Sequence, residues 1–329
     1  MEDKQKTILL SLALSGDEDY LLKYAVNFCE RMHMKLELFH VVQDITPYAS
    51  DTAYFPETML PVSPEESLKK SALETMEKMA EGYDTSVIRA INVNVGWIEH
   101  CVSRYVERNG IDFVMLARGK DYHNFFNRMT SSLKSMSFSS SVPLIIVPKG
   151  YSKEISDLPK ILVPDSLDSA HRGVVSVASS ISSHLKEVQL YHIHVSEDFS
   201  YDIEQVPASK FEAVFEALSE GEDGQNFSEM ISDYIRKKMI SRWKSGGDEG
   251  EDQVDYRTLL LRGEPSIELK TLEERLSPDL LVIGSQSSSL WSQIFHRNKI
   301  PFEEQMDVGV PLLLVPEKYT KELEYKTAA

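Results

Sequence analysis

The chain has few cysteines, no long apolar run and a deficit of basic residues. Two cysteines among 329 residues exclude a small secreted scaffold held together by disulfides. No apolar segment approaches the roughly 20 residues that span a bilayer. No apolar segment follows a basic region at the N-terminus, so we expect no signal peptide. These absences predict a cytoplasmic protein that does not enter a membrane.

The two cysteines, Cys29 and Cys101, lie on the apolar stripes of two predicted helices. In a cytoplasmic protein we expect both thiols to be reduced and buried, with a disulfide between them as the alternative. Nucleophilic catalysis has no support, because the chain lacks a Gly-x-Ser-x-Gly elbow and neither cysteine lies in an electropositive setting. A phosphate-binding loop ending in Gly-Lys-Ser/Thr is also absent, since Gly119-Lys120 stands alone.

Acidic residues outnumber basic ones by 52 to 35, which gives a net charge of −17. Such a field repels nucleic acid unless a local basic patch overrides it. The nearest basic group is Arg236–Lys238 with Arg242 and Lys244, and it is typical of the solvated face of a helix. We therefore expect no nucleic-acid partner.

The most informative motif is an apolar heptapeptide bounded by prolines that occurs twice. Val142–Pro148 reads V-P-L-I-I-V-P, and Val310–Pro316 reads V-P-L-L-L-V-P. Proline cannot donate to a sheet ladder, so each copy indicates a buried strand with defined ends. The spacing of the copies indicates an internal repeat.

Matching segments precede each copy in the same order. The strands predicted in the first half are Thr7–Leu14, Lys35–Val42, Ser86–Val95 and Phe113–Ala117. Those predicted in the second half are Lys160–Pro164, Val188–Val195, Asp255–Leu261 and Leu280–Ile283. Helical periodicity occupies Tyr20–His33, Trp97–Arg108, His171–Leu185 and Ser266–Leu276. Strands that alternate with helices predict an α/β fold with parallel sheets covered on both faces.

A chain of 329 residues has the length of two ordinary domains. We expect a first domain over 1–149, a linker over 150–159, a second domain over 160–318 and a tail over 319–329. The second domain carries an extension at about 196–253 with a helix from Phe227 to Trp243. Its stretches rich in Gly, Asp and Glu predict mobile loops.

The ordered motifs resemble those of tandem universal stress proteins. Each half opens with T-I-L-L-S or K-I-L-V-P and continues through L-F-H-V or I-H-V to Gly96 or Gly263. Each half then runs through I-D-F-V-M-L-A-R-G or P-D-L-L-V-I-G-S and closes with V-P-L-x-x-V-P. The resemblance implies two flavodoxin-like (adenine-nucleotide alpha hydrolase-like) open sheets of five parallel strands. It also implies that the units pair through their last strands, Val142–Pro148 and Val310–Pro316, as a pseudo-dimer, and a homodimer is a further option.

In the ATP-binding branch of that family, the loop after the fourth strand reads Gly-x-x-Gly, nine residues, then Gly with Ser or Thr. Such glycines let backbone amides approach phosphates at a helix N-terminus. The residues at these places are Leu116, Gly119, Met129 and Thr130 in the first half, and Gly284, Ser287, Arg297 and Asn298 in the second. The branch also has a base-contacting aspartate after the first strand. Ala13 takes that place in the first half, and either Asp165 or Ser166 takes it in the second. The ATP signature is therefore eroded in both halves.

Open α/β sheets still bind ligands at the carboxyl ends of their strands. The candidate nucleotide crevices, for ATP, ADP or AMP, comprise Ala13, Val41, Gly96, Gly119, Thr130, Ser131, Asp165, Val195, Gly263, Gly284, Ser285 and Ser287. Hydroxyls such as Thr130 and Ser131 have the alternative role of capping a helix.

Histidines suggest a site of another class. His192 and His194 are two residues apart on one predicted strand, so both side chains point to one face and both can reach one zinc ion, with His171 or Asp165 as further ligands. The alternative is an ordinary family histidine near a strand end, as His40 is in the first half.

The sequence thus predicts a non-enzymatic stress-response protein whose nucleotide sites are eroded or retuned. An adenine-nucleotide binder that uses one unit, with at most slow ATP hydrolysis, is one alternative. A metal or small-ligand sensor at His192 and His194 is another.

Overall fold

The computed structural model describes residues 5–43, 64–84, 86–118, 140–165, 172–196, 235–241, 243–244, 254–285 and 309–320. The chain divides into two compact units, Met1–Ile155 and Ser156–Ala329. Among the described residues no helix is long and apolar enough to cross a membrane.

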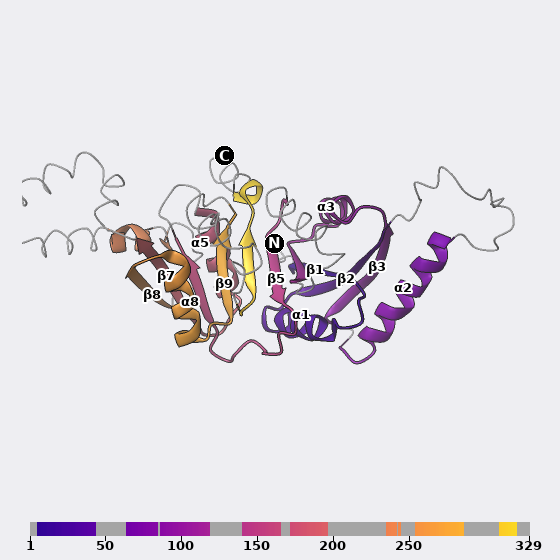
Figure 1. Ribbon diagram of the computed structural model, residues 1–329, viewed down its shortest axis with the longest axis horizontal. Helices are drawn as coiled ribbons and strands as arrows, with labels where there is room; N and C mark the ends of the chain where they lie inside the picture. Colours follow the sequence, from indigo (N-terminus) through magenta and orange to yellow (C-terminus); the bar gives the residue numbers. More distant parts are fainter. Residues whose placement is uncertain are drawn as a thin grey trace, which may run out of the picture. The chain divides into compact units, whose positions relative to one another are not determined.

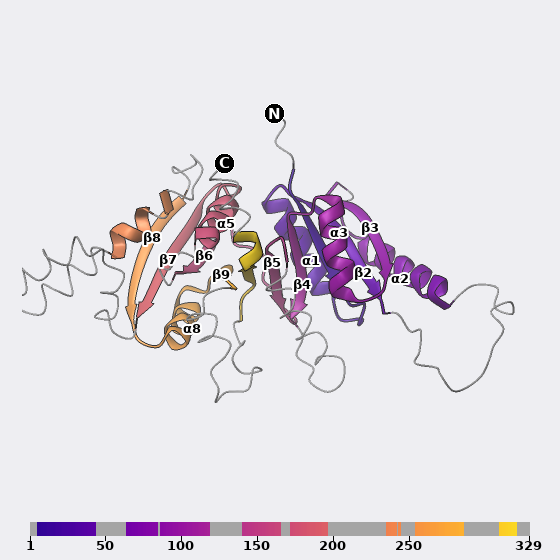
Figure 2. The ribbon, with the colours of Figure 1, turned by 90° about the horizontal axis from the view of Figure 1, so that it is seen from above.

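In its described residues the first unit has five strands and three helices, and Figure 1 shows how they are arranged. Its strands are β1 (Thr7–Leu12), β2 (Lys35–Val42), β3 (Ile88–Val95), β4 (Phe113–Arg118) and β5 (Leu144–Pro148). Its helices are α1 (Asp19–Arg31), α2 (Pro64–Ala80) and α3 (Ile98–Asn109). α1 contacts β1, β2 and β4, and α2 contacts β2 and β3. Figure 1 shows α3 on the other side of this sheet from α1, and Figure 2 shows α3 extended along the strands.

The second unit repeats this sequence of elements. Its strands are β6 (Lys160–Pro164), β7 (Val188–Ser196), β8 (Val254–Arg262), β9 (Leu280–Gly284) and β10 (Leu312–Val315). Its named helices are α5 (Arg172–Ser182) and α8 (Pro265–Leu276). A further helical segment covers 235–241 and 243–244, within the helix predicted from Phe227 to Trp243.

Both units have the same strand order and only parallel pairs. The order is β3-β2-β1-β4-β5 in the first unit and β8-β7-β6-β9-β10 in the second. Numbered within a unit, this is 3-2-1-4-5, the beginning of the Rossmann order, whereas flavodoxin itself has 2-1-3-4-5. The predicted α/β fold with open parallel sheets is confirmed. The order of the strands is a detail that the sequence pattern left unspecified.

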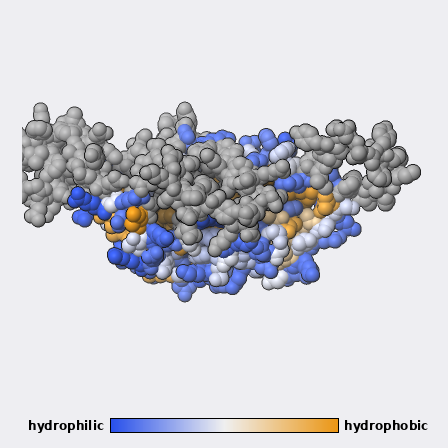
Figure 3. Space-filling model, viewed as in Figure 1, coloured by the Kyte–Doolittle hydropathy of each residue, from blue (hydrophilic) through white to orange (hydrophobic). Residues whose placement is uncertain are grey.

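The core of each unit lies on both faces of its central strands. Ile8, Leu9 and Leu10 of β1 are fully buried, and β9 and β10 are buried along their whole length. Burial on two faces explains the apolar runs without polar alternation. The edge strands β3 and β8 are only half-buried, and Figure 3 shows apolar residues at the surface near them.

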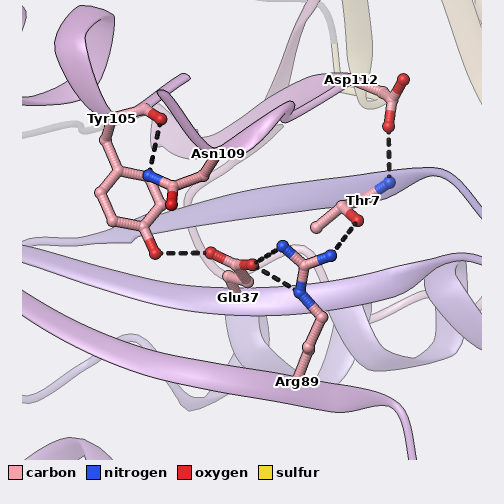
Figure 4. Close-up of polar contacts among 6 residues, drawn as sticks. All are labelled: Thr7, Glu37, Arg89, Tyr105, Asn109 and Asp112. Atoms are coloured by element: carbon pink, nitrogen blue, oxygen red, sulfur yellow. Dashed lines mark hydrogen bonds and ion pairs between the residues drawn. The ribbon is translucent and has the colours of Figure 1, made fainter. Parts of the chain in front are cut away.

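The same aspartate contact begins the central strand of each unit. The Asp112 carboxylate accepts a hydrogen bond from the Thr7 N–H at 2.8 Å, and the Asp112 N–H donates to the Thr7 carbonyl at 2.9 Å (Figure 4). Asp279 and Lys160 make the corresponding pair of bonds, both at 2.9 Å. Thr7 of the first unit therefore corresponds in position to Lys160 of the second.

A buried carboxylate joins three elements of the first unit. Glu37 on β2 is 2% exposed and accepts hydrogen bonds from Arg89 Nε on β3 and Tyr105 Oη on α3, both at 2.7 Å (Figure 4). Burial, reinforced by the Glu37 carboxylate, raises the pKa of Tyr105. A buried charge needs such partners, because an unpaired one is strongly destabilising. This network lies near the amino end of β2, away from the predicted crevice.

One strand boundary and the burial of one cysteine differ from the prediction in ways that the backbone and the burial make plain. β1 ends at Leu12 rather than Leu14, because Leu14 has a left-handed backbone (φ 56°) that cannot continue a strand. Cys29 is buried as predicted, but Cys101 on α3 is only partly buried. The two thiols are not bonded to each other.

We predict that Asp279→Ala lowers the free energy of unfolding by about 1–3 kcal/mol, because it removes a charged acceptor from backbone donors. Its carboxylate accepts bonds from the backbone N–H groups of Lys160 and Ser156 and from the Ser156 hydroxyl, each at 2.9 Å. Urea unfolding provides the measurement. Glu274→Ala, on the exposed side of α8, makes the same change of charge and should stay within about 0.5 kcal/mol of wild type. Equal losses of unfolding free energy in the two variants would contradict the role given to the Asp279 carboxylate.

Candidate functional site

The predicted crevices lie at the carboxyl ends of β1 and β6. In each unit the strand order reverses between the first and fourth strands, so connections leave the sheet in opposite directions there. This switch point lies between β1 and β4 in the first unit and between β6 and β9 in the second. The residues that follow these strands decide what either crevice can bind.

The strand registers resolve the alternative between Asp165 and Ser166. β1 pairs with β2 from Thr7↔Lys35, and β6 pairs with β7 from Lys160↔Gln189. Leu12 lies five residues beyond Thr7, and Asp165 lies five residues beyond Lys160. Asp165 therefore corresponds to Leu12. The place held by Ala13 falls to Ser166, which lies outside the described residues.

Two equivalent histidines support this register. His40 Nδ1 lies 2.8 Å from the carbonyl oxygen of Leu12, and His194 Nδ1 lies 2.8 Å from the carbonyl oxygen of Asp165. Each ring thus joins the second strand of its unit to the end of the first. With Nδ1 protonated, both rings donate to a carbonyl that has left the ladder, which is a common role for a buried histidine.

The Asp165 side chain belongs to a buried polar chain in the second unit. His192 Nε2 lies 2.9 Å from Asp165 Oδ2, and His192 Nδ1 lies 2.7 Å from Tyr256 Oη. The side chains of His192 and Asp165 are both 1% exposed. With Nε2 protonated, the ring donates to the carboxylate and accepts from the tyrosine hydroxyl. Burial, and next the charge of Asp165, raise the pKa of Tyr256, so this hydroxyl keeps its proton.

An aromatic side chain covers this chain of hydrogen bonds. Trp243 stacks on Tyr256, with ring centroids 5.0 Å apart and an interplanar angle of 23°. In the first unit the places of Asp165 and His192 hold Leu12 and Leu38, both buried. The second unit has therefore exchanged an apolar contact for a polar one. Its atoms satisfy each other, which removes the usual penalty for burying them.

Metal binding by His192 and His194 has no third ligand in the described part of the chain. No group of three or more His, Cys, Asp or Glu residues within it is placed to hold a metal ion. Both ring nitrogens of His192 lie within hydrogen-bond distance of Asp165 or Tyr256, and His194 Nδ1 contacts a carbonyl. His171, the other predicted ligand, lies outside the described residues.

In the first unit an internal carboxylate occupies the loop after β1. Glu18 is 5% exposed, and it accepts hydrogen bonds from the N–H groups of Ala13 at 2.9 Å and Ser15 at 3.3 Å. Asp17, next to it, forms an ion pair with Lys149 at 2.6 Å. Burial, together with the charges of Glu18 and Asp17, raises the pKa of Tyr20 to about 12. This end of the crevice therefore already holds two carboxylates.

The two glycines before α3 and α8 have the same unusual backbone. Gly96 has φ 137° and Gly263 has φ 150°, which side chains rarely adopt. A Cβ atom on Gly263 would also lie 2.7 Å from Glu268 Oε1, and one on Gly96 would lie 3.3 Å from Cys101 Sγ. A side chain from the helix that follows therefore packs closely against each glycine.

The remaining predicted residues of the crevices have mixed placements. Val41 and Val195 are buried in β2 and β7, and Gly284 ends β9. Ser285 is 3% exposed, and its hydroxyl accepts a hydrogen bond from the Glu317 N–H at 2.9 Å. Ser285 therefore supports the backbone after β10. Gly119, Thr130, Ser131 and Ser287 lie outside the described residues.

Sequence reasoning missed Glu18, Tyr256 and Trp243. Glu18 is the N-cap residue before α1, where an acidic residue is ordinary because of the helix dipole. Glu18 lies five residues after Ala13 in the sequence. Only the bend of the loop between them brings its carboxylate back to the Ala13 N–H. Tyr256 lies on β8, the strand that follows the predicted extension, and Trp243 lies at the end of the helix predicted within that extension.

We predict that Gly263→Ala and Gly96→Ala each lower the free energy of unfolding by about 1–3 kcal/mol, because alanine is strained at these φ values. Thermal melts followed by circular dichroism give the measurement. Gly82→Ala is the matched control, since no atom lies within 4 Å of a Cβ placed there. It should be neutral or stabilising by up to about 1 kcal/mol. If Gly82→Ala lost as much stability as the other two variants, backbone strain at Gly96 and Gly263 would not be the cause.

We predict that Tyr256→Phe destabilises the second unit by about 1–3 kcal/mol, because His192 Nδ1 loses its buried donor. Urea unfolding followed by tryptophan fluorescence measures the effect. Tyr191→Phe is the control, since the Tyr191 hydroxyl lies 3.4 Å from Gln189 Oε1 in a weaker contact. Its effect should stay below about 1 kcal/mol. Similar losses in both variants would mean that the Tyr256–His192 bond contributes nothing specific.

Comparisons with known proteins establish the fold. No protein-family model matches the sequence, and no curated protein matches it. A universal stress protein from Archaeoglobus fulgidus DSM 4304 superposes with a TM-score of 0.60 at 14% identity, covering 94% of this chain and 96% of that one. A functionally unknown protein from Pseudomonas aeruginosa PAO1 gives 0.54 at 15%, covering 99% and 98%.

A putative universal stress protein from Pseudomonas aeruginosa UCBPP-PA14 gives a TM-score of 0.51 at 15% identity and covers 99% of both chains. Sequence identities this low carry no information on ligands or activity. Over nearly its whole length, the chain therefore has the fold of solved universal stress proteins.

Proposed function

We propose that the chain is a tandem member of the universal stress protein family. In this proposal it acts by binding and signalling rather than by turnover, and neither unit uses its crevice as an ATP site. The fold supports the family, and the repeated strand order and register support the tandem origin.

One observation carries the functional part of this proposal. Asp165, the one aspartate next to the base-contacting place, corresponds to Leu12 and turns its carboxylate to His192. The base-contacting place itself then holds Ala13 and Ser166, and neither side chain carries a charge. Each unit therefore lacks, at this place, the aspartate that contacts the base in the ATP-binding branch.

Hydrogen bonds within the chain at the two crevices bear on the same proposal. The Ala13 amide is already bonded to Glu18, and the Ser285 hydroxyl is already bonded to Glu317. The Ala13 amide is not available to a phosphate without breaking its bond to the Glu18 carboxylate, and a hydrogen bond to a charged group contributes about 1.5–3 kcal/mol. The net charge of −17 adds a general repulsion of anions.

Pairing of Val142–Pro148 with Val310–Pro316 forms part of the same proposal. Both segments contain the last strand of a unit, β5 or β10, and the prolines at their ends limit the length of any ladder. An open edge strand invites aggregation. The two edges would protect each other within one chain if they paired.

The test is the nucleotide content of protein purified without added nucleotide. We expect that the denatured protein releases no ATP, ADP or AMP detectable by mass spectrometry. We also expect that 5–10 mM Mg-ATP, about the highest cellular range, leaves the melting temperature unchanged, because a ligand well above its Kd must stabilise the fold. Magnesium chloride at equal ionic strength is the control. Stoichiometric nucleotide in the released fraction would overturn the proposal.

A further inference from the structure

The helical segment over 235–241 and 243–244, which we call the basic helix, carries charges of one sign. The sequence has no acidic residue between positions 234 and 247, and its basic residues there are Arg236, Lys237, Lys238, Arg242 and Lys244. Like charges three or four residues apart on a helix destabilise it. Solvation alone gives no reason for this pattern, because mixed charges keep a helix in water equally well and support it by ion pairs.

One face of the basic helix is packed within the second unit. Ile235, Met239 and Trp243 follow one another at intervals of four residues, and all three are buried. Trp243 stacks on Tyr256 of β8, and the Tyr256 hydroxyl in turn lies 2.7 Å from His192 Nδ1 on β7. The apolar face therefore holds the helix against the unit, and its other face is turned to solvent.

The outer face combines cations with an exposed apolar side chain. Arg236, Lys237 and Lys244 are exposed, and Ile240 is 39% exposed. Arg236, Ile240 and Lys244 are four residues apart in turn, so the isoleucine lies between two cations on one stripe. A single exposed isoleucine is ordinary. Between two cations, it gives the surface an apolar contact and a charged one side by side.

The first unit provides an internal comparison for this helix. α2 lies between β2 and β3 in the chain, as the basic helix lies between β7 and β8. α2 also buries a narrow apolar face, at Ala72 and Met76. Its charges are mixed, however: Glu65, Glu66, Glu74 and Glu77 occur with Lys69, Lys70 and Lys78. A helix in this place of the fold therefore has no need of a single sign of charge, and the basic surface is particular to the second unit.

The charge of the rest of the chain limits which anion can bind there. In about 0.15 M salt, charges are screened beyond about 8 Å, so a ligand confined to the basic helix meets mainly its cations. An extended polyanion such as RNA or an anionic membrane also meets the rest of a chain with a net charge of −17, which repels it. An acidic protein segment is small enough to remain on the helix, and its apolar side chains can cover Ile240.

We propose that the outer face of the basic helix is a docking surface for an acidic protein segment. Carboxylates of the segment pair with Arg236 and Lys244, and an apolar side chain between them packs on Ile240. A guanidinium group binds a carboxylate through two parallel hydrogen bonds, which adds geometric specificity to the charge. This inference goes beyond the proposed function, since it concerns an outer surface, and it does not depend on whether either unit holds nucleotide.

The first experiment titrates a fluorescein-labelled peptide with the full chain and follows fluorescence anisotropy in about 0.15 M salt. The peptide consists of Asp and Glu residues around a central Leu-Leu pair. We expect saturable binding to wild type. The double variant Arg236→Glu with Lys244→Glu should weaken it at least about tenfold, because two attractive charge pairs become repulsive. Absence of saturable binding to wild type would overturn the proposal.

The matched control is the double variant Lys69→Glu with Lys70→Glu, which makes the same change of charge on exposed positions of α2. Peptide binding should stay within about twofold of wild type, because charges away from the docking surface are screened. Both double variants should melt within about 2 °C of wild type, as expected for exposed side chains. Equal weakening of peptide binding in the two variants would show a general charge effect and overturn the proposal.

A further variant, Ile240→Ser, tests the apolar part of the surface without a change of charge. It should weaken binding of the same peptide by at least about threefold, because less apolar area leaves water on binding. Binding as tight as that of wild type would reject the contact at Ile240, and with it the chemistry given to the partner. If the double variant at Arg236 and Lys244 does not fold, Arg236→Gln with Lys244→Gln takes its place and should weaken binding in the same direction.

Two other probes separate the possible occupants of this surface. Single-stranded poly(U) RNA and phosphatidylserine vesicles are titrated under the same conditions, and we expect weaker binding to both than to the peptide. If either bound as tightly as the peptide, and lost that binding in Arg236→Glu with Lys244→Glu, the surface would belong to that polyanion and the proposal would be wrong. Release of nucleotide from the purified protein would overturn the proposed function and would leave all of these outcomes unchanged.

Discussion

Each unit is organised by the burial of its central strand, β1 or β6, between parallel neighbours. A strand that is covered on both faces must leave every backbone donor and acceptor satisfied, and its ends are where the ladder stops supplying partners. Side chains supply them instead. Asp112 and Asp279 bind the first residues of the two strands, and His40 and His194 lie against the carbonyls at their far ends. These four contacts lie at equivalent positions in the two units and agree with the register that strand pairing sets.

The two units satisfy the polar groups at the ends of their strands in different ways. In the first unit, the amides beyond β1 are bonded to Glu18. In the second, the polar groups at the strand ends are arranged as Asp165, His192 and Tyr256, under the ring of Trp243. Both arrangements place a carboxylate where an open α/β sheet would receive a ligand, and both leave it bonded to the chain itself. In both units a carboxylate near the end of the first strand is thus bonded to other groups of the same unit.

Much of the fold follows from local sequence pattern. The ranges of β2 and β6 agree with the apolar runs Lys35–Val42 and Lys160–Pro164, and α1 follows its periodic stripe to within two residues. Patterns of this kind reflect burial on one face or two, which a single segment already encodes. The pattern did not indicate the left-handed turn at Leu14, because a leucine offers no local reason to adopt it. The candidate site was predicted less well, since Glu18 and Tyr256 have roles only in relation to distant backbone.

The sequence alone determined the repeated order of strands and helices, the paired proline-bounded heptapeptides and the positions of Gly96 and Gly263 before their helices. These are properties of single segments, which composition and spacing express directly. Only the tertiary structure decided that Asp165 stands at the place of Leu12 rather than Ala13, and that it binds His192. The reason is that a shift of one residue turns a side chain to the opposite face of a strand. Strand pairing, which no segment specifies by itself, sets that register.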